Sequence, residues 1–319
     1  MLPNLAADSR RVSSRAHRIH AYGGPEVMQV DEVAIPTYAD NDVLVQVMAA
    51  GINAMDWKIR DGLFRQVRPV EFPATLGFEF AGIVVGVGRF VSTLMLGDHV
   101  FAPLAGMGAY ADFVTVPESQ VSRTPDGLLD VEAAAIPIAA LTAWQALEAA
   151  GTTAGSTVVI HGAAGGVGSF ATQFAKRMGA KVLATASATS RAHVLRLGAD
   201  QVLDYKAEPF ERKCSNADVV LDLVGRDLAD RSSSILRPGG VIVSPATPNL
   251  DQHYTGDRRA LGIQMHGDPE RLLTIARDVC AGCLKNTISA VVSRSDMSAA
   301  IERAKTGHAP GKAVVDFTS

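Results

Sequence analysis

Cysteine is scarce in this chain, so a framework of disulfide bonds is not what holds its fold together. Only three of the 319 residues are cysteines, which suits a reducing compartment, and we therefore expect a cytoplasmic protein. Two of them, Cys280 and Cys283, form a single C-x-x-C. The apolar spacing around this pair predicts a helix, and packing of small apolar side chains is a better interpretation there than a redox or metal site.

The sequence also lacks long apolar runs and a large excess of charge of either sign. No segment approaches the roughly 20 apolar residues that span a membrane, and no basic run is long enough to favour nucleic acid as a partner. Aromatic residues make up only 6% of the chain, but 47% of it is hydrophobic, which is ordinary for an α/β protein of two domains with a large core.

The N-terminal part of the chain changes character near residue 15. Residues 1–14 carry arginine and serine with little apolar content and no signal-peptide core, so we expect a disordered tail, with an organellar transit peptide as the alternative. From Ala16 to about Pro137, short apolar runs alternate with Gly, Pro and Asp turns, as in a compact β-rich domain.

The stretch from Ser156 to Ser187 has the pattern of a nucleotide-binding unit. Thr157 to Ile160 predicts a buried strand, the glycines that follow predict a turn, and the apolar period after them predicts a helix that begins near Gly166. Lys181 to Ala186 predicts a second strand. A strand, glycine turn, helix and strand of this size are typical of dinucleotide binding.

Glycine suits this turn because a pyrophosphate must approach backbone N–H groups at the start of the helix, where a Cβ would hold it away. The fingerprint G-x-G-x-x-G is imperfect, since Ala163 replaces its first glycine and Gly165 and Gly168 supply the others. We assign Gly165, Gly166, Val167 and Gly168 to the cofactor site, with a merely tight connection as the alternative.

The second strand of the unit ends without the carboxylate that usually holds the ribose 2′-hydroxyl of NAD. Ser187, Ser190 and Arg191 stand there instead, and their hydroxyls and guanidinium suit a 2′-phosphate. The sequence therefore favours NADPH as the cofactor. Arg191 as a solvated residue on the following helix is the alternative.

The residues after this unit show a similar order of strand, helix, turn and strand. Ala217 to Val224 predicts a strand, a helix follows to about Leu236, and the sequence RPGG predicts a turn into a strand over Val241 to Ser244. Because strand ends face the cofactor in such sheets, Leu223, Val224 and the loop from Pro245 to Pro248 should line its nicotinamide half. Plain core is the alternative for these apolar residues.

Polar residues cluster just after a predicted strand in the β-rich part. The sequence AAGINAMDWKIRDG brings Asn53, Asp56 and Lys58 together there, and we take them as candidate catalytic residues. The alternative is the start of a surface helix with Asn53 or Asp56 as its N-cap. Glu79, in LGFEFAGIVVGVG, is an acid in apolar surroundings that could simply be paired within the fold.

Seven motifs in order along the chain carry a resemblance to a known family. They are AAGINAMDWKIRDG, LGFEFAGIVVGVG, GAYADFVTVP, AALTAWQAL, HGAAGGVG, LGADQVLDY and GKAVVDF. Together the chain resembles the zinc-independent quinone oxidoreductase (zeta-crystallin-like) branch of the medium-chain dehydrogenase/reductase superfamily. The resemblance implies a GroES-like catalytic domain over 15–138 and 271–319, a Rossmann domain with a doubly wound parallel sheet over 139–270, and a homodimer.

The same resemblance extends the expected site. It implies that Thr142, Tyr205 and Lys312 also contact the cofactor. Zinc-bearing relatives place a Cys where this chain has Asn53 and a His where it has Phe78, so we expect no metal. The eight histidines show no metal spacing.

These features predict an NADPH-dependent reductase that passes hydride to a quinone or an α,β-unsaturated carbonyl. Reduction of a simple carbonyl asks for a Lewis acid, whereas a conjugated acceptor spreads the incoming charge and needs only a few hydrogen-bond donors. The alternative from another class is a protein that binds NADPH with little turnover, as a sensor or structural protein. A zinc alcohol dehydrogenase is disfavoured by the missing ligands.

Overall fold

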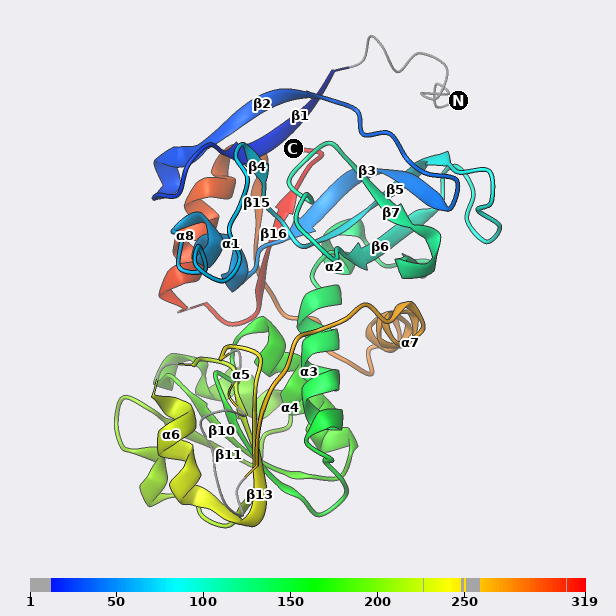
Figure 1. The fold of residues 1–319 in the computed structure, drawn as a ribbon. Helices are drawn as coiled ribbons and strands as arrows, with labels where there is room; N and C mark the ends of the chain where they lie inside the picture. Colours follow the sequence, from blue (N-terminus) through cyan, green and yellow to red (C-terminus); the bar gives the residue numbers. More distant parts are fainter. Residues whose placement is uncertain (1–12, 226, 248–249, 251–258, 308) are drawn as a thin grey trace.

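The computed structural model describes residues 13–225, 227–247, 250, 259–307 and 309–319. Figure 1 shows two bodies, one above the other, with the long helix α3 (Pro137–Ala149) running from one into the other. The chain fills most of the upper body first, then builds the lower one, and returns to the upper body with its last strands.

The upper body is a β-rich domain made of two sheets. A seven-stranded sheet runs in the order β15-β16-β3-β5-β6-β8, with β7 also pairing with β3. A three-stranded sheet has the order β2-β1-β4. The strands are β1 (Ser13–Ile19), β2 (Met28–Ala34), β3 (Asp42–Gly51), β4 (Ala74–Thr75), β5 (Glu79–Val87), β6 (His99–Pro103), β7 (Phe113–Pro117), β8 (Ser122–Arg123), β15 (Ile288–Ser293) and β16 (Lys312–Asp316).

The lower body is a parallel sheet with helices on both faces. Its strands follow the order β11-β10-β9-β12-β13-β14, and every neighbouring pair is parallel. They are β9 (Thr157–His161), β10 (Lys181–Ala186), β11 (Gln201–Asp204), β12 (Ala217–Asp222), β13 (Leu236–Ser244) and β14 (Arg259–Gly262). The helices around it are α3, α4 (Gly166–Arg177), α5 (Arg191–Arg196) and α6 (Leu228–Ser232).

Successive side chains of β9 pack against different helices, which shows which helices cover each face of the parallel sheet. Val158 and Ile160 of β9 pack in one cluster with α3, α4 and α5, while Val159 between them packs in another cluster with α6. Successive side chains of a strand point to opposite faces, so a strand that is apolar throughout buries both. The sheet therefore keeps its two loop edges as the places open to a ligand.

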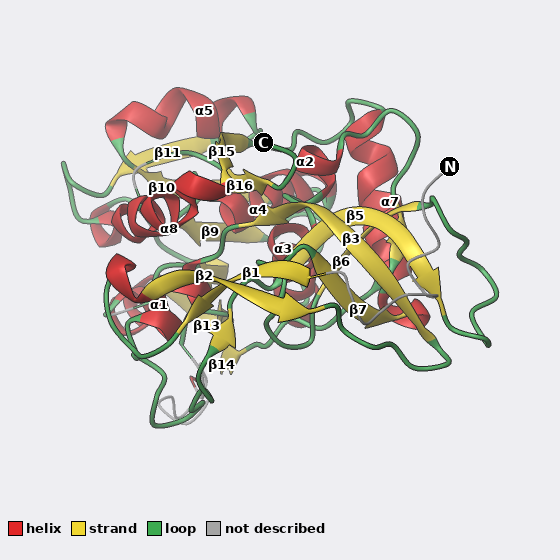
Figure 2. Ribbon diagram, turned by 90° about the horizontal axis from the view of Figure 1, so that it is seen from above, coloured by secondary structure: helices red, strands yellow, loops and turns green. Residues whose placement is uncertain are grey.

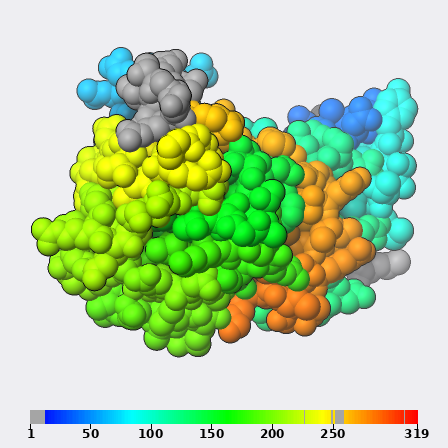
Figure 3. Space-filling view, turned by 90° about the horizontal axis from the view of Figure 1, so that it is seen from below, coloured from blue at the N-terminus to red at the C-terminus, as the bar shows by residue number. Residues whose placement is uncertain are grey.

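Four further helices lie in the described part of the chain. In the view from above, α1 and α8 lie on the opposite side of the molecule from α7 (Figure 2). The space-filling view from below shows the green and yellow surface of the parallel-sheet domain running into the orange surface of α7 and the residues after it (Figure 3). The four further helices are α1 (Ala54–Arg60), α2 (Asp130–Ala133), α7 (Pro269–Cys280) and α8 (Met297–Thr306).

The two domains also meet through the end of the chain. Gly311, just before β16, forms an isolated parallel bridge with Gly165 of the glycine turn, and its N–H donates to the carbonyl of Ala164 at 2.8 Å. The return to the upper sheet is therefore braced against the predicted nucleotide-binding turn. This contact puts that turn beside the first residue of β16, Lys312.

Several expectations need correction. Ser13 and Ser14 belong to β1, so the expected tail extended two residues too far, and residues 1–12 lie outside the described part. The sequence RPGG is not a separate turn but part of β13, which pairs with β12 through a register shift; Gly239 there has φ +75°. Cys280 is the last residue of α7 and Cys283 lies beyond the helix, and both are exposed rather than packed.

Candidate active site at the junction of the domains

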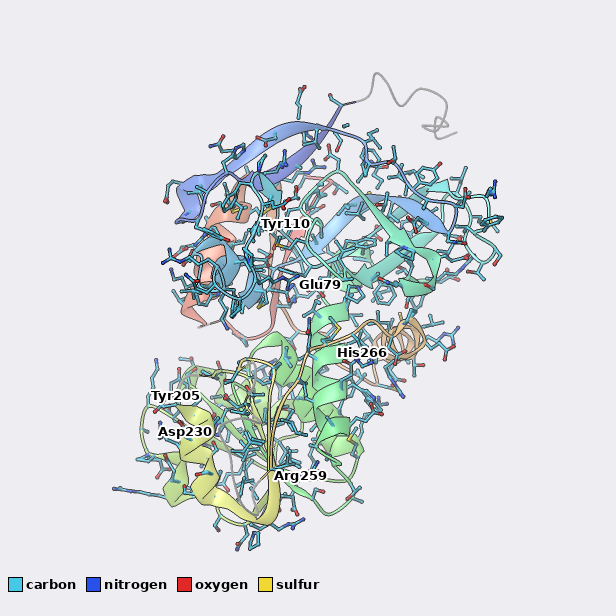
Figure 4. The ribbon with its side chains drawn as sticks, in the orientation of Figure 1. Glu79, Tyr110, Tyr205, Asp230, Arg259 and His266 are labelled. Atoms are coloured by element: carbon cyan, nitrogen blue, oxygen red, sulfur yellow. The ribbon has the colours of Figure 1, made fainter. Side chains whose placement is uncertain are left out.

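Three polar side chains meet in a buried cluster where the domains join. Asn53, Glu79 and Lys312 are 8%, 0% and 6% exposed. The ammonium of Lys312 contacts both Glu79 Oε1 and Asn53 Oδ1, and Asn53 Nδ2 donates to Glu79 Oε1 at 2.8 Å. The N–H of Ile138, at the start of α3, donates to Glu79 Oε2 at 2.7 Å. Glu79 is thus paired within the fold, and Figure 4 shows it at the lower edge of the upper domain, next to α3.

The pairing of strands explains why these residues meet. β3 lies between β16 and β5 and is antiparallel to both, so the residue after its end lies beside the first residues of its two neighbours. Those first residues are Lys312 and Glu79, and Asn53 follows β3. Gly51 is needed beside them, because a Cβ there would come within 2.3 Å of Glu79 Oε1 and 2.7 Å of the Ala134 carbonyl.

Asp56 is fully buried, and both of its carboxylate oxygens accept hydrogen bonds from the chain. Its Oδ2 accepts from the N–H of Asn53 at 2.7 Å and from the hydroxyl of Tyr110 at 2.9 Å, and its Oδ1 accepts from the N–H of Gly77 at 3.1 Å. Burial raises the pKa of Asp56 to about 6, although these hydrogen bonds oppose the shift. Of the two N-cap candidates, Asn53 is the N-cap of α1, and Asp56 is the third residue of that helix, where its carboxylate accepts from the N–H of Asn53. A catalytic role for Asp56 stays a prediction.

Lys58 is half-buried on α1. Burial lowers the pKa of Lys58, and the charge of Asp222 at the end of β12 partly opposes this shift. Its Nζ lies 5.8 Å from the centre of the neighbouring Trp57 ring, and within the described residues no hydrogen bond fixes it.

The glycine turn has open space beside Gly165. Gly165 caps α4 with φ −71°, and a Cβ there would have the Gly162 carbonyl, at 3.6 Å, as its one neighbour within 4 Å. A Cβ on Gly166 would make ordinary contacts with Lys312 and Ala139. Gly168 differs, since its Cβ would come within 2.3 Å of the Gly162 carbonyl oxygen. Gly168 is thus required by packing, while the open space at Gly165 and the free N–H groups of α4 fit a dinucleotide phosphate.

The residues expected to read the adenosine end gather at the ends of two neighbouring strands. Ser187 follows β10, and its hydroxyl lies 3.2 Å from that of Ser190. Arg191 begins α5, is exposed, and donates through Nη1 to the Val202 carbonyl at 2.6 Å. Tyr205 follows β11, which pairs with β10, and is 54% exposed. Figure 4 shows Tyr205 in the lower domain, far from Glu79 and Tyr110.

The residues expected near the nicotinamide lie at the corresponding edge of the sheet. Val224, after β12, is 44% exposed, while Leu223 and Pro245 are half-buried. Thr142 is buried on α3, at 5% exposure. Val167, which was expected at the glycine turn and not at the nicotinamide, is half-buried on α4. Pro248, at the end of the expected loop, lies outside the described residues.

Two buried titratable residues were not singled out from the sequence. His161 ends β9, and its ring nitrogens lie 3.1 Å from Thr185 Oγ1 and 3.0 Å from Ser232 Oγ. Burial lowers the pKa of His161 to about 4, so the ring is neutral at pH 7. Opposite it, Asp222 ends β12 at 0% exposure. Their positions at the carboxyl ends of parallel strands were the signal that could have identified them.

The described residues contain no group of three or more His, Cys, Asp or Glu side chains that could hold a metal ion. His253 and His308 lie outside that part of the chain. Phe78, at 8% exposure, and the amide of Asn53 replace an imidazole and a thiolate in the expected zinc positions. Among the described helices, none is both long and apolar enough to cross a membrane.

Two family models match this chain. Residues 39–126 match the alcohol dehydrogenase GroES-like domain, and residues 197–315 match a model described as zinc-binding dehydrogenase. The first match covers β3 to β8 of the upper domain, and the second runs from the parallel sheet into β16.

Individual proteins give the same result over longer stretches. The chain is 36% identical to a quinone oxidoreductase of Sus scrofa over 72% of this chain and 71% of the relative. It is 36% identical to the 2-methylene-furan-3-one reductase of Solanum lycopersicum over 70% of this chain, and the match spans 59% of that relative. The structure of the Escherichia coli quinone oxidoreductase complexed with NADPH superimposes with a TM-score of 0.85 at 29% identity, over 95% of this chain and 100% of that one.

Proposed function

The chain belongs to the medium-chain dehydrogenase/reductase superfamily, and from that premise we propose that it is an NADPH-dependent reductase of quinones or α,β-unsaturated carbonyls. One observation supports this most strongly. The bridge between Gly165 and Gly311 brings the glycine turn, where a Cβ on Gly165 would meet little, next to the buried cluster of Asn53, Glu79 and Lys312. A cofactor held at the turn would therefore extend toward polar groups of the other domain.

The proposed cofactor contacts follow the sheet edge. The N–H groups of Gly166, Val167 and Gly168 would hold the pyrophosphate, and the residues after β10 and β11 would hold the adenosine end. The nicotinamide end would lie toward the junction. The remaining proposed contacts are Thr142, Ser187, Ser190, Arg191, Tyr205, Leu223, Val224, Pro245 and Lys312. NADPH supplies the hydride when bound.

In the proposed reaction the protein positions groups and excludes water. Hydride addition to a conjugated acceptor spreads negative charge onto its oxygen, and the half-buried Lys58 ammonium would attract that charge. Asn53 is held by Glu79 and Lys312, so its amide is preorganised at the junction. Solvent supplies the final proton, and no side chain acts as an obligatory general acid.

We propose that this reaction uses no zinc, because an amide and a phenyl ring are not ligands that zinc prefers. The family resemblance also supports the proposed domain limits. The GroES-like domain would cover residues 15–138 and 271–319, and the Rossmann domain would cover residues 139–270. A homodimer and a cytoplasmic location are proposed too, and the three free cysteines suit a reducing compartment.

The test compares NADPH and NADH as donors with a panel of small quinones and enones. NADPH should be consumed faster, and Arg191→Ala should weaken NADPH binding by about tenfold to a hundredfold while NADH changes little, since a charge-assisted contact is worth roughly 1.5–3 kcal/mol. Arg196→Ala, which removes an exposed cation from the same helix, is the matched control. Equal losses for both cofactors would contradict the assignment. Tight NADPH binding without turnover on any acceptor would favour the binding-protein alternative.

A further inference from the structure

The carboxylate of Glu79 is buried and accepts hydrogen bonds from three separate segments of the chain. Its Oε1 accepts from Asn53 Nδ2 at 2.8 Å and from the Lys312 ammonium, and its Oε2 accepts from the N–H of Ile138 at 2.7 Å. The side chain is 0% exposed, so these donors must come from the protein. Only an ionised carboxylate can accept at both of these oxygens, because a glutamine in its place would turn an N–H group toward one of the donors.

These contacts allow only one orientation of the Asn53 amide. A lysine ammonium can only donate and an ionised carboxylate can only accept, so Asn53 Oδ1 faces Lys312 and Nδ2 faces Glu79. Nδ2 also lies 3.4 Å from the Gly51 carbonyl oxygen, and the backbone N–H of Asn53 is held separately by Asp56. Because the oxygen and the nitrogen of an amide have nearly the same shape, it is the two neighbouring charges that distinguish its ends.

The cluster is fixed at the place where the upper domain meets the lower one. A Cβ on Gly166 would lie 3.4 Å from Lys312 Cδ, so the Lys312 side chain runs along the glycine turn. The residue before it, Gly311, donates to the Ala164 carbonyl of that turn at 2.8 Å. Ile138, the third donor to Glu79, lies in the first turn of α3. The Asn53 amide is therefore oriented beside the turn that is proposed to hold the cofactor.

We propose that Glu79 is a positioning residue that fixes, together with Lys312, which end of the Asn53 amide can donate a hydrogen bond. Glu79 acts through Asn53 and is itself closed to solvent. A reversed amide would put its oxygen where its N–H groups are now, and it could no longer donate to a ligand oxygen at that place. The inference deepens the proposed function, because its effect on turnover rests on Asn53 acting beside the reacting groups.

Two variants separate the orientation of the amide from the stability of the fold. In Glu79→Gln, one end of the new side chain must face a donor, either Ile138 or the pair of Lys312 and Asn53. In the double variant Glu79→Gln, Lys312→Met, the new amide can accept from Ile138 and donate to Asn53 Oδ1. The double variant therefore keeps its hydrogen bonds satisfied while the Asn53 amide reverses.

The first measurement is the NMR spectrum of the Asn53 amide, which needs no turnover. In protein labelled with [¹⁵N]asparagine, the Asn53 side-chain signals are identified by their absence from Asn53→Ala. A proton donated to a carboxylate makes a strong, charge-assisted hydrogen bond and resonates downfield, so it should move upfield in Glu79→Gln and in the double variant. The matched control is Glu118→Gln, which should leave these signals and kcat unchanged, since Glu118 binds the N–H groups of Thr93 and Leu94 instead.

Unchanged Asn53 signals in both Glu79 variants would overturn the proposal, whether or not the protein proves to be a reductase. If Glu79→Gln alone does not fold, the double variant carries this spectral test.

The second measurement is kcat with saturating NADPH and a small quinone. Glu79→Gln should lower kcat by about tenfold in the wild-type background but by less than about twofold in the Asn53→Ala background, because Glu79 acts through Asn53. Equal losses in both backgrounds would show that Glu79 only supports the fold, and would overturn the proposal. A wild-type protein that turns over no acceptor would contradict the proposed function, while the spectra would still decide whether Glu79 orients Asn53.

Discussion

Asp56 holds its charge at a cost to the fold. Its pKa in the folded protein is about 6, above the ordinary value of 3.8, so the folded state binds more protons than the unfolded chain between those pH values. Stability from this group is therefore present at low pH and lost as the pH rises from about 4 through 6. Because Asp56 binds Asn53, Gly77 and Tyr110, that cost is the price of fixing the loop which carries the site.

The variant Asp56→Asn should remove this pH dependence. Its free energy of unfolding, relative to wild type, should rise by about 2 kcal/mol between pH 4 and pH 7, since one pKa unit corresponds to about 1.4 kcal/mol. Urea unfolding at several pH values measures this difference, and the other titrating groups cancel in the comparison. Parallel stability curves for the two proteins would show that Asp56 titrates normally.

Asn53, Asp56 and Lys58 could be predicted as a group from the sequence, because they lie close together along the chain just after a predicted strand. It left open whether Asp56 was a cap, since its partners Gly77 and Tyr110 come from distant segments. Asp222 and His161 were not singled out, because an acid or a histidine in a strand is ambiguous until the neighbouring strands are placed beside it.

The glycine turn shows what can be decided at the scale of one element. Strand, turn, helix and strand follow from local periodicity, and the structure confirms them as β9, α4 and β10. The RPGG segment was predicted wrongly, because its place in β13 depends on pairing with β12 through a bulge. Local chemistry indicates that a chain turns, but only the partner strand decides whether it also pairs.

Glycines of the same turn should respond differently to substitution. Gly165→Val should fold with a Tm near that of wild type and lose NADPH binding, because its side chain would occupy open space at a backbone conformation that other residues adopt. Gly168→Ala should instead lose several kcal/mol of stability, on the order of 3 or more, because its Cβ meets a backbone oxygen. Thermal unfolding and NADPH titration by calorimetry separate the two effects. Unchanged NADPH affinity in folded Gly165→Val would place the phosphates elsewhere.

For the whole molecule, the buried pair of Lys312 and Glu79 joins two segments that are far apart in the sequence. The family resemblance predicted the two-domain α/β fold, which the comparisons and the sheets confirm. It marked Lys312 for the cofactor and did not predict that its ammonium is held by Glu79 and Asn53. Such a contact depends on the order of strands in the assembled sheet, which no local pattern encodes.

Breaking this pair from one side should be worse than removing both charges. Lys312→Met leaves Glu79 buried with its charge unpaired and should cost about 3–5 kcal/mol, whereas the Lys312→Met, Glu79→Gln double variant should recover part of that loss. Urea unfolding of the two variants gives the comparison. A double variant less stable than Lys312→Met would show that the remaining hydrogen bonds of Glu79, and not its charge, dominate.

The bridge between Gly165 and Gly311 also imposes an order on how the protein is made. During synthesis the glycine turn leaves the ribosome well before β16, and the central place of β16 between β15 and β3 is filled only when that strand emerges. The nascent parallel sheet can pair early, because all its strands precede β16. The brace on its turn, and the sheet that carries Asn53, are completed together when β16 pairs.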